Sequence, residues 1–509
     1  MSTSTLVRGR WVIPGAGGAV LRDGAVLVEG TKVAAVDHWE TLRAQHPAAQ
    51  VIGSERMVVL PGLINAHHHS KGVSTIQHGV EDMLLEPWIL AHHRARRGDP
   101  RLDAMLSAAE QLRSGVTSVV NVLNASGDQE SFARTVGDTM AGYAASGMRA
   151  VTAAGVTTRS FLVSGADEDQ RFIDALPEAV RGYARKLLPD ASRITEDAYF
   201  EVMESIWREY RDHSRVGLWF GPPGPQWVSD AFMVRIAEHA ESWDVGVQTH
   251  VDESIYEMIH GPRFYGKPTM LHLNDLGVLS PRFSIAHGVW LTEDEIAVMA
   301  ETGASVSHNP SSNLRLRAGI APLNGLLTGG VNVALGMDGT TLNEDEDMFS
   351  EMRLALRLHG TPVLGEAAPA PAEIFSLATL GGARLMREEG RLGRIAGGHA
   401  ADLVLVDLGR MTWPWMAPEA DPRDVVLYRA RAGDVDTVLV DGEVVLRDGM
   451  PTRFDVEDVG RELAERLDAT PYPEEGARLV EQLLPHLEAW YREWHIPDLD
   501  PWIRYNSKR

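Results

Sequence analysis

The chain has 509 residues, of which 44% are hydrophobic, so it can bury a large core and is too long for a small binding module. Its formal net charge of -23 argues against a nucleic-acid or anionic-membrane surface, because such surfaces depend on clustered Lys and Arg. It contains no Cys, which excludes disulfides, thiolate metal sites and a cysteine nucleophile, so any metal ligands must be His and carboxylate.

The N-terminal segment lacks the apolar run of a secretory signal. No uninterrupted apolar stretch in the sequence is long enough to span a bilayer. We therefore expect a cytoplasmic protein that acts on a small molecule and has neither a membrane nor a nucleic acid as partner.

Short apolar runs broken by Gly-rich turns open the chain, and the same pattern returns near its end. The early runs lie within residues 6–59, and the late ones are Ala401–Asp407 and Val435–Leu446. Such runs are typical of β-strands. The two β-rich ends can pair into one small domain, which we predict as a β-sandwich built from residues 1–58 and 391–455.

Between these ends, short apolar runs alternate with longer helical patterns, which is typical of repeated βα units. The candidate strands are Val58–Ile64, Thr117–Val122, Arg149–Val156, Val216–Phe220, Val245–Thr249, Phe283–Ala286, Ala304–Ser307 and Val331–Gly336. Eight such units close into a barrel. We therefore predict an α/β fold with a (β/α)8 TIM barrel over residues 59–390.

Five of these strands end at His or Asp. The residues are His67 with His69, His250, His287, His308 and Asp338. Because barrel enzymes place their active sites at the C-terminal ends of the strands, this pattern predicts a catalytic site there.

Two segments fall outside the regular alternation. Residues 167–214 are too long for one connecting helix and predict extra helices over the barrel mouth. Residues 456–509 form an aromatic-rich helical tail, amphipathic over residues 473–494, with a kink expected at Pro485.

Three consecutive histidines, His67, His68 and His69, follow the first barrel strand. Side chains two apart in an extended backbone share a face, so the outer two can hold one metal while His68 points away. His250 lies three residues before Glu253, a carboxylate able to move protons. Each residue alone is more often structural, and it is their joint placement that indicates a metal site.

Seven segments carry a resemblance to a known family. They are Pro61–His69, His250–Ser254, Ala286–Thr292, Ser307–Leu316, Gly336–Gly339, Ala378–Arg384 and Gly390–Val404. In this order, within about Leu6 to Arg453, the sequence resembles the amidohydrolase superfamily, in the branch that includes cytosine, guanine and S-adenosylhomocysteine deaminases and the triazine hydrolases.

The resemblance implies one divalent metal ion that activates water, with the ligands His67, His69, His250 and Asp338. Zinc is expected, with iron, manganese or cobalt as alternatives. Asp338 would also take up the proton of the water, and Glu253 would pass protons to the substrate and the leaving group. His287 would either polarise the reacting group or only orient the water.

The expected number of metal ions depends on whether a lysine lies at the end of the fourth barrel strand. Binuclear relatives bridge two ions with a carbamylated lysine from the fourth strand. The five lysines of this chain are Lys32, Lys71, Lys186, Lys267 and Lys508. None of them lies at the end of the fourth candidate strand, so a mononuclear centre is expected.

Candidate substrate contacts are aromatic and polar side chains near strand ends: Trp88, Asn121, Trp219, His308 and Asn309. Aromatic rings can stack on a planar substrate, and amides can bind the edge of a heterocycle. Each of these residues, taken alone, is more often a packing or turn residue than a ligand contact.

The family resemblance implies hydrolysis of a C–N bond, most often deamination of a purine, pyrimidine or triazine. Hydrolysis of an acyclic urea, carbamate, thiocarbamate or amide is an alternative, as is dechlorination or dealkylamination of a triazine. A catalytically inactive barrel used for assembly is a remote alternative, because the ligands and Glu253 are all present. We also expect a homo-oligomer, with the tail packed either on the barrel or across a subunit interface.

Overall fold

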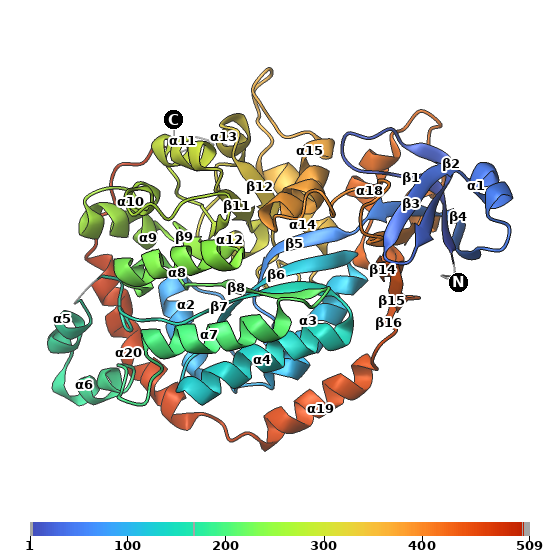
Figure 1. Ribbon diagram of the computed structural model, residues 1–509. Helices are drawn as coiled ribbons and strands as arrows, with labels where there is room; N and C mark the ends of the chain where they lie inside the picture. The colour runs from blue at the N-terminus through green and yellow to red at the C-terminus, as the bar shows by residue number, and fades with distance from the viewer. Residues whose placement is uncertain (1–3, 166–167, 340, 501, 503–509) are drawn as a thin grey trace.

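Eight parallel strands form the centre of the molecule, with helices around them (Figure 1). The computed structural model describes residues 4–165, 168–339, 341–500 and 502. The strands are β5 (Leu63–His68), β6 (Val116–Asn124), β7 (Arg149–Gly155), β8 (Val216–Phe220), β9 (Val247–Val251), β10 (Phe283–His287), β11 (Ser305–His308) and β12 (Asn332–Leu335). Each pairs with the next along the chain, so the predicted α/β barrel is confirmed.

The barrel closes between its last strand, β12, and its first, β5. The N–H of Asp338 donates to the carbonyl of His67 (2.9 Å), and the N–H of Met337 donates to Oδ1 of Asn65 (3.0 Å). Because all eight strands run in the same direction, the residues that follow them meet at one rim of the barrel.

Helices between and after the strands bury the outer face of the barrel in the main hydrophobic core. They include α3 (Pro100–Arg113), α4 (Gln129–Ser146), α7 (Glu196–Tyr210), α8 (Asp230–Trp243), α10 (Thr269–Asp275), α11 (Glu293–Thr302), α13 (Leu323–Thr328), α14 (Met348–Leu358) and α15 (Pro371–Ser376). The short helix α16 (Gly382–Leu385) packs in a separate cluster with Ile64 of β5.

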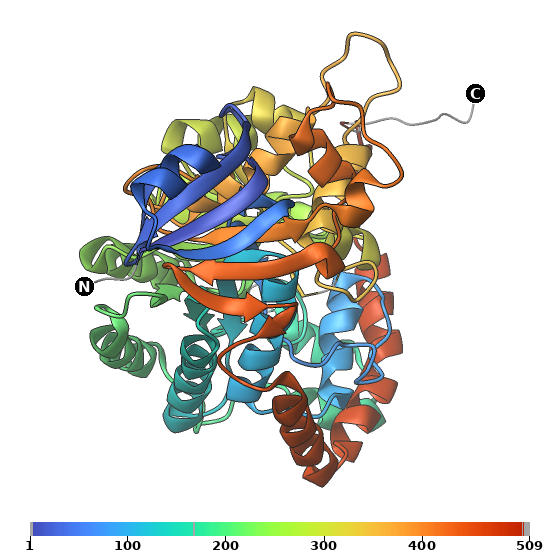
Figure 2. The same ribbon diagram turned by 90° about the vertical axis from the view of Figure 1, so that its right-hand side faces the viewer.

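The two ends of the chain pair into a second sheet beside the barrel, where Figure 2 shows blue and orange strands side by side. Its strands are β1 (Thr5–Val12), β2 (Leu21–Glu29), β3 (Lys32–His38), β4 (Gln50–Pro61), β13 (Leu403–Asp407), β14 (Val435–Val440), β15 (Glu443–Arg447) and β16 (Met450–Pro451). The accompanying helices are α1 (Trp39–Gln45), α17 (Gly409–Thr412) and α18 (Pro422–Arg429). β4 pairs antiparallel with β13, so both ends contribute to one domain, as predicted.

The first predicted barrel strand, Val58–Ile64, is divided between the two sheets. Its residues up to Pro61 belong to β4, and β5 begins at Leu63. Gly62 lies between them, where an added Cβ would come within 2.1 Å of Thr117 Oγ1. The chain passes from one sheet to the other at this close contact. The sequence shows one continuous apolar run here and so does not reveal the boundary.

A buried ion-pair cluster joins the small sheet to the start of the barrel strands. Arg149, the first residue of β7, lies 3.2 Å from Asp402 and 2.8 Å from Asp441. Both carboxylates belong to the C-terminal part of the sheet domain. The two domains are thereby joined by charge as well as by apolar packing.

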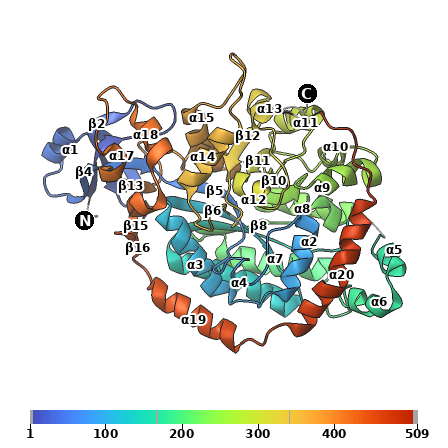
Figure 3. The ribbon, with the colours of Figure 1, turned by 180° about the vertical axis from the view of Figure 1, so that it is seen from behind.

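The segment between β7 and β8 contains two helices beyond the barrel helix α7: α5 (Glu168–Ala175) and α6 (Glu178–Arg185). The C-terminal tail forms α19 (Val456–Ala469) and α20 (Glu474–Arg492), which run along the outside of the barrel (Figure 3). α20 continues through Pro485. Asp167 and residues 503–509, with Lys508, lie outside the described residues. Within the described ranges, no helix is long and apolar enough to cross a membrane.

Candidate metal centre

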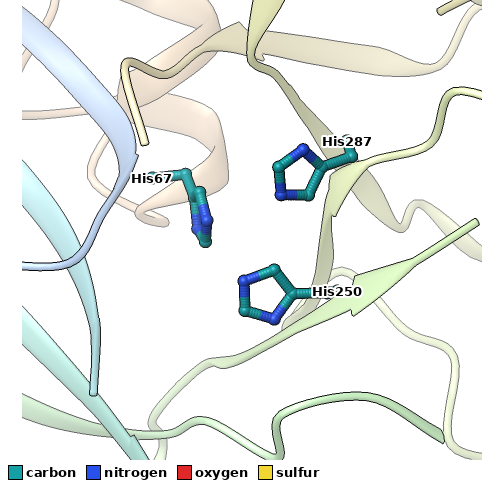
Figure 4. Close-up of side chains that lie close together, drawn as sticks. All are labelled: His67, His250 and His287. Atoms are coloured by element: carbon teal, nitrogen blue, oxygen red, sulfur yellow. The ribbon is translucent and has the colours of Figure 1, made fainter. Parts of the chain in front are cut away.

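Three imidazoles and one carboxylate meet at the C-terminal rim of the barrel. Nε2 of His67 and Nε2 of His69 lie 3.2 Å and 3.0 Å from Oδ1 of Asp338. Nε2 of His250 lies 3.4 Å from Nε2 of His69. Figure 4 shows His67 and His250 facing each other, with His287 beside them. The structure thus brings together the four residues expected to be ligands.

The outer nitrogen of each imidazole is held by an oxygen acceptor. Nδ1 of His67 bonds to Oε1 of Gln248 (2.9 Å). Nδ1 of His69 bonds to the carbonyl of Val122 (2.8 Å), and Nδ1 of His250 bonds to that of Pro223 (2.7 Å). Because these acceptors require the proton on Nδ1, each Nε2 keeps its lone pair for the centre.

Two nitrogen atoms at the centre show that the residues fit a metal ion. Nε2 of His67 and Nε2 of His287 are buried, and neither has a hydrogen-bond partner among the described residues. A buried lone pair without a partner is costly, and a metal ion would satisfy it. Three overlapping groups have ligand atoms within 4.8 Å of one another: His67–His250–His287, His67–His69–Asp338 and Glu253–His287–Asp338.

Burial controls the charge of the cluster. It lowers the pKa of His69 and holds that of His250 well below its usual value, which favours neutral imidazoles. Burial acts to raise the pKa of Asp338, but the neighbouring imidazoles of His67 and His69 outweigh it and hold that pKa well below its ordinary value. Neutral nitrogen donors beside an ionised carboxylate suit a divalent cation.

Glu253 and His287 lie beside this group. Oε2 of Glu253 is 3.4 Å from Nε2 of His287, and both side chains are buried. Burial, followed by the charges of Glu257, Asp338 and Glu86, raises the pKa of Glu253 well above its usual value. Burial lowers the pKa of His287 to about 4. Burial thus favours the uncharged form of both side chains.

Two residues of the centre occupy an uncommon backbone conformation. His287 has φ 75° and Asp338 has φ 57°, both in the left-handed region that residues other than glycine seldom adopt. Such positions cluster at functional sites, where the surrounding structure holds them. This backbone conformation changes the direction of each side chain from the one that regular strand alternation would give, and both side chains point to the centre.

Helix α12 (Pro310–Arg315) supplies side chains that hold the residues of the centre in position. These side chains were not among the site residues predicted from the sequence. Oγ of Ser312 donates to Oδ2 of Asp338, and Nδ1 of His287 bonds to Oδ1 of Asn313 (2.9 Å). Arg315 pairs with Asp82 (2.7 Å), in the segment after β5. These α12 side chains all lie within the family motif Ser307–Leu316, which could have indicated that they belong to the site.

Trp88 lies near the rim, on α2 (Leu85–Ala91). Nζ of Lys71 is 4.7 Å from its ring centroid, and the His92 ring lies edge-on to it at 4.2 Å. Lys71 follows two residues after His69 in the chain. Trp88 also packs against the hydrophobic cluster that includes Leu483 and Leu487, and its contact with a substrate stays a prediction.

His308 and Asn309 lie behind the centre. Nε2 of His308 is 3.0 Å from Nε2 of His359, so its ring points toward the end of α14. Oδ1 of Asn309 accepts from Ser307 (2.9 Å), and its Nδ2 is 3.4 Å from Nδ1 of His287. These contacts support neighbouring residues, and a role in substrate binding stays a prediction.

Asn121 and Trp219 point elsewhere. Asn121 shares a face of β6 with Val119, which packs in the core between the barrel and its helices. The Trp219 ring packs against Gly246 and lines a cavity of about 550 Å³ with Arg149, at the start of β7. Strand alternation therefore directs Asn121 toward the helices, while the Trp219 ring lies near the start of β9.

Comparison with known proteins agrees with this geometry. Residues 58–445 match the family described as "Amidohydrolase family". Residues 24–49 match the "Imidazolonepropionase-like composite domain, bacteria". These two matches cover most of the barrel and of the small sheet.

Among curated proteins, a 5'-deoxyadenosine deaminase of Methanothermobacter thermautotrophicus is 31% identical over 88% of this chain and 94% of its own length. A 5-methylthioadenosine/S-adenosylhomocysteine deaminase of Nitratidesulfovibrio vulgaris is 30% identical over 86% of this chain and 90% of its own. Among solved structures, a zinc-bound adenosine deaminase from Xanthomonas campestris has a TM-score of 0.77 and 28% identity. That match covers 92% of this chain and 99% of the solved chain.

Proposed function

This chain belongs to the amidohydrolase family and is a hydrolase of C–N bonds, and we propose that it deaminates a 6-aminopurine nucleoside. In this reaction a water oxygen bonds to the ring carbon that carries the amine. The C–N bond then breaks and ammonia leaves, so the amine is replaced by a carbonyl oxygen. The named activities of the relatives above support this substrate class.

We assign one divalent metal ion to His67, His69, His250 and Asp338, and we favour zinc because three nitrogen donors and one oxygen suit it. The related adenosine deaminase structure also contains zinc. An ion bound there would lower the pKa of water from about 15.7 to roughly 7 and so supply hydroxide at neutral pH. β8 ends at Phe220 without a lysine, which supports a single ion.

Glu253 is the proposed proton shuttle. Its Oε2 faces the reaction centre beside His287, and the acid form donates a proton to the ring nitrogen next to the reacting carbon. Asp338 takes up the proton of the attacking water, and a further transfer through Glu253 releases the amine as ammonia. His287, held by Asn313 through Nδ1, orients the water or the developing oxygen with Nε2.

The observation that carries this proposal is the convergence of three Nε2 atoms and one carboxylate, with every Nδ1 of the three ligands bonded outward. The test is metal analysis of the purified chain, followed by ammonia release from adenosine, 5'-deoxyadenosine and 5-methylthioadenosine. We expect about one metal ion per chain and ammonia from at least one nucleoside.

The same assay includes guanine, cytosine, an aminotriazine, an aryl urea and a thiocarbamate. Turnover of only an acyclic compound would overturn the nucleoside proposal while leaving the metal site intact. Protein that binds no metal and is unaffected by a chelator would overturn both. The expected homo-oligomer and cytoplasmic location stay predictions, testable by light scattering and cell fractionation.

A further inference from the structure

The C-terminal helix α20 packs against segments that follow three different barrel strands. A hydrophobic cluster distinct from the main core joins α20 to α2, after β5, to the α5–α6 region, after β7, and to Tyr256 and Ile259, after β9. Figure 3 shows α20 alongside α2, with α5 and α6 beyond it. Its buried members in the tail are Leu479, Val480, Leu483, Leu487, Tyr491 and Trp494. The tail thus covers the side of the barrel mouth.

Tyr491 links two of these segments. Its Oη accepts the backbone N–H of Ser164 (2.9 Å) and lies 3.3 Å from the Ser164 hydroxyl. Its ring centroid is 4.8 Å from that of Tyr256, on α9 (Ile255–His260). Tyr491 and Ser164 are both buried.

The segment 161–164 follows β7, and the side chains of Asp169 and Tyr491 accept hydrogen bonds from its backbone N–H groups. Asp169 accepts the N–H groups of residues 161, 162 and 163 at 2.7, 2.9 and 3.1 Å. Tyr491 accepts the fourth, from Ser164. Four consecutive N–H groups are therefore held by side chains, and the C-terminal tail supplies one of the two acceptors.

This segment reaches the neighbourhood of Glu253. Phe161 and Leu162 line a cavity of about 60 Å³ together with Glu86, Leu483 and Leu487. Glu86 accepts a hydrogen bond from Ser254, the residue that follows Glu253. The tail and the segment 161–164 therefore line the same cavity, and Glu86 connects that cavity to the backbone segment that contains Glu253.

We propose that Tyr491 is a positioning residue for substrate binding: its hydroxyl fixes the segment 161–164 as a wall of the substrate chamber. This inference rests on the proposed function, since that function locates the chamber at the rim beside Glu253. Tyr491 lies beyond residue 445, where the family match ends.

The test is Tyr491→Phe in the full chain, which removes one oxygen and keeps the ring. We expect KM to rise about tenfold, with kcat and metal content within twofold of the unmodified protein. Hydrogen exchange at the amides of residues 161–164 should accelerate at least tenfold, because Ser164 loses its acceptor. Tyr472→Phe is the matched control, since Tyr472 precedes α20 and is 48% exposed.

Unchanged KM and unchanged exchange in Tyr491→Phe would overturn the inference. A fall in kcat accompanied by metal loss would also overturn it, since that result means general damage. If the enzyme hydrolyses another compound, the nucleoside proposal fails, and the same KM comparison with that compound still tests Tyr491.

Discussion

Ser312 donates a hydrogen bond from Oγ to Oδ2 of Asp338, while Oδ1 of the same carboxylate faces His67 and His69. One oxygen of Asp338 is thus held from behind and the other is presented to the centre. Partners of this kind orient a ligand, and their loss typically weakens metal binding 10- to 100-fold.

Ser312→Ala should therefore weaken metal binding by about that 10- to 100-fold factor. Competition with a chelator measures the affinity. Ser242→Ala is the control, because that hydroxyl lies on exposed helix surface and bonds to the carbonyl of His239. Equal affinities in Ser312→Ala and the unmodified chain would show that Asp338 needs no such support.

Glu253→Gln should keep its metal and lose turnover by about 10²- to 10⁴-fold, because an amide cannot shuttle the proton. Metal content and kcat are measured on the same preparation. Glu241→Gln, an exposed change on α8, serves as the control. If the Glu253→Gln variant loses its metal in step with its activity, Glu253 supports the ligands and is not the shuttle.

Removal of the metal should lower the unfolding temperature. A ligand that binds only the folded state stabilises it by about 4 kcal/mol at a thousandfold excess over Kd. Here the ligands come from β5, β9 and the turn after β12, so the ion joins distant parts of the barrel. Calorimetry after chelation, then with zinc restored, measures the effect. An identical unfolding temperature in all three states would contradict the assigned site.

Glu351 should make stability depend on pH. Burial raises its pKa from 4.5 to about 8, even though Ser311 donates to it. The folded state then binds the proton more tightly than the unfolded chain does. The contribution of Glu351 is complete below pH 4.5 and is lost as the pH rises toward 8, by about 1.4 kcal/mol for each pH unit between these two pKa values.

Glu351→Gln should remove that slope. Denaturant unfolding at pH 5 and pH 8 measures it, and the difference between the two pH values should be smaller in the variant. Gln can still accept the N–H of Ser311, so the local structure is preserved. A variant with the same pH dependence as the unmodified chain would show that Glu351 ionises normally.

The sequence allowed the fold and the centre of the site to be predicted because both depend on short-range patterns. Apolar runs located the strands to within a few residues, and the His and Asp residues that end them lie at one rim, as the barrel geometry requires. His67, His69 and Asp338 are within contact distance for that reason.

The remaining features depend on side-chain orientation and on contacts between residues far apart in the chain, which the sequence pattern does not give. Trp219 was expected near the rim, but its ring packs on Gly246 at the opposite end of the barrel. The division at Gly62 follows from contact with Thr117, on another strand. The contact between Tyr491 and Ser164 joins residues 327 positions apart. Tertiary packing decides all three.

The pairing of β4 with β13 also determines the order of events during synthesis. Pro61 pairs with Leu403, so β4 leaves the ribosome long before its partner strand exists. At about 5–20 residues per second, the wait is on the order of tens of seconds. Val58, Val59 and Leu60 are fully buried in the finished protein. A nascent chain carries this apolar strand with one edge unpaired until the whole barrel has been made, so a chaperone that binds early should protect it most.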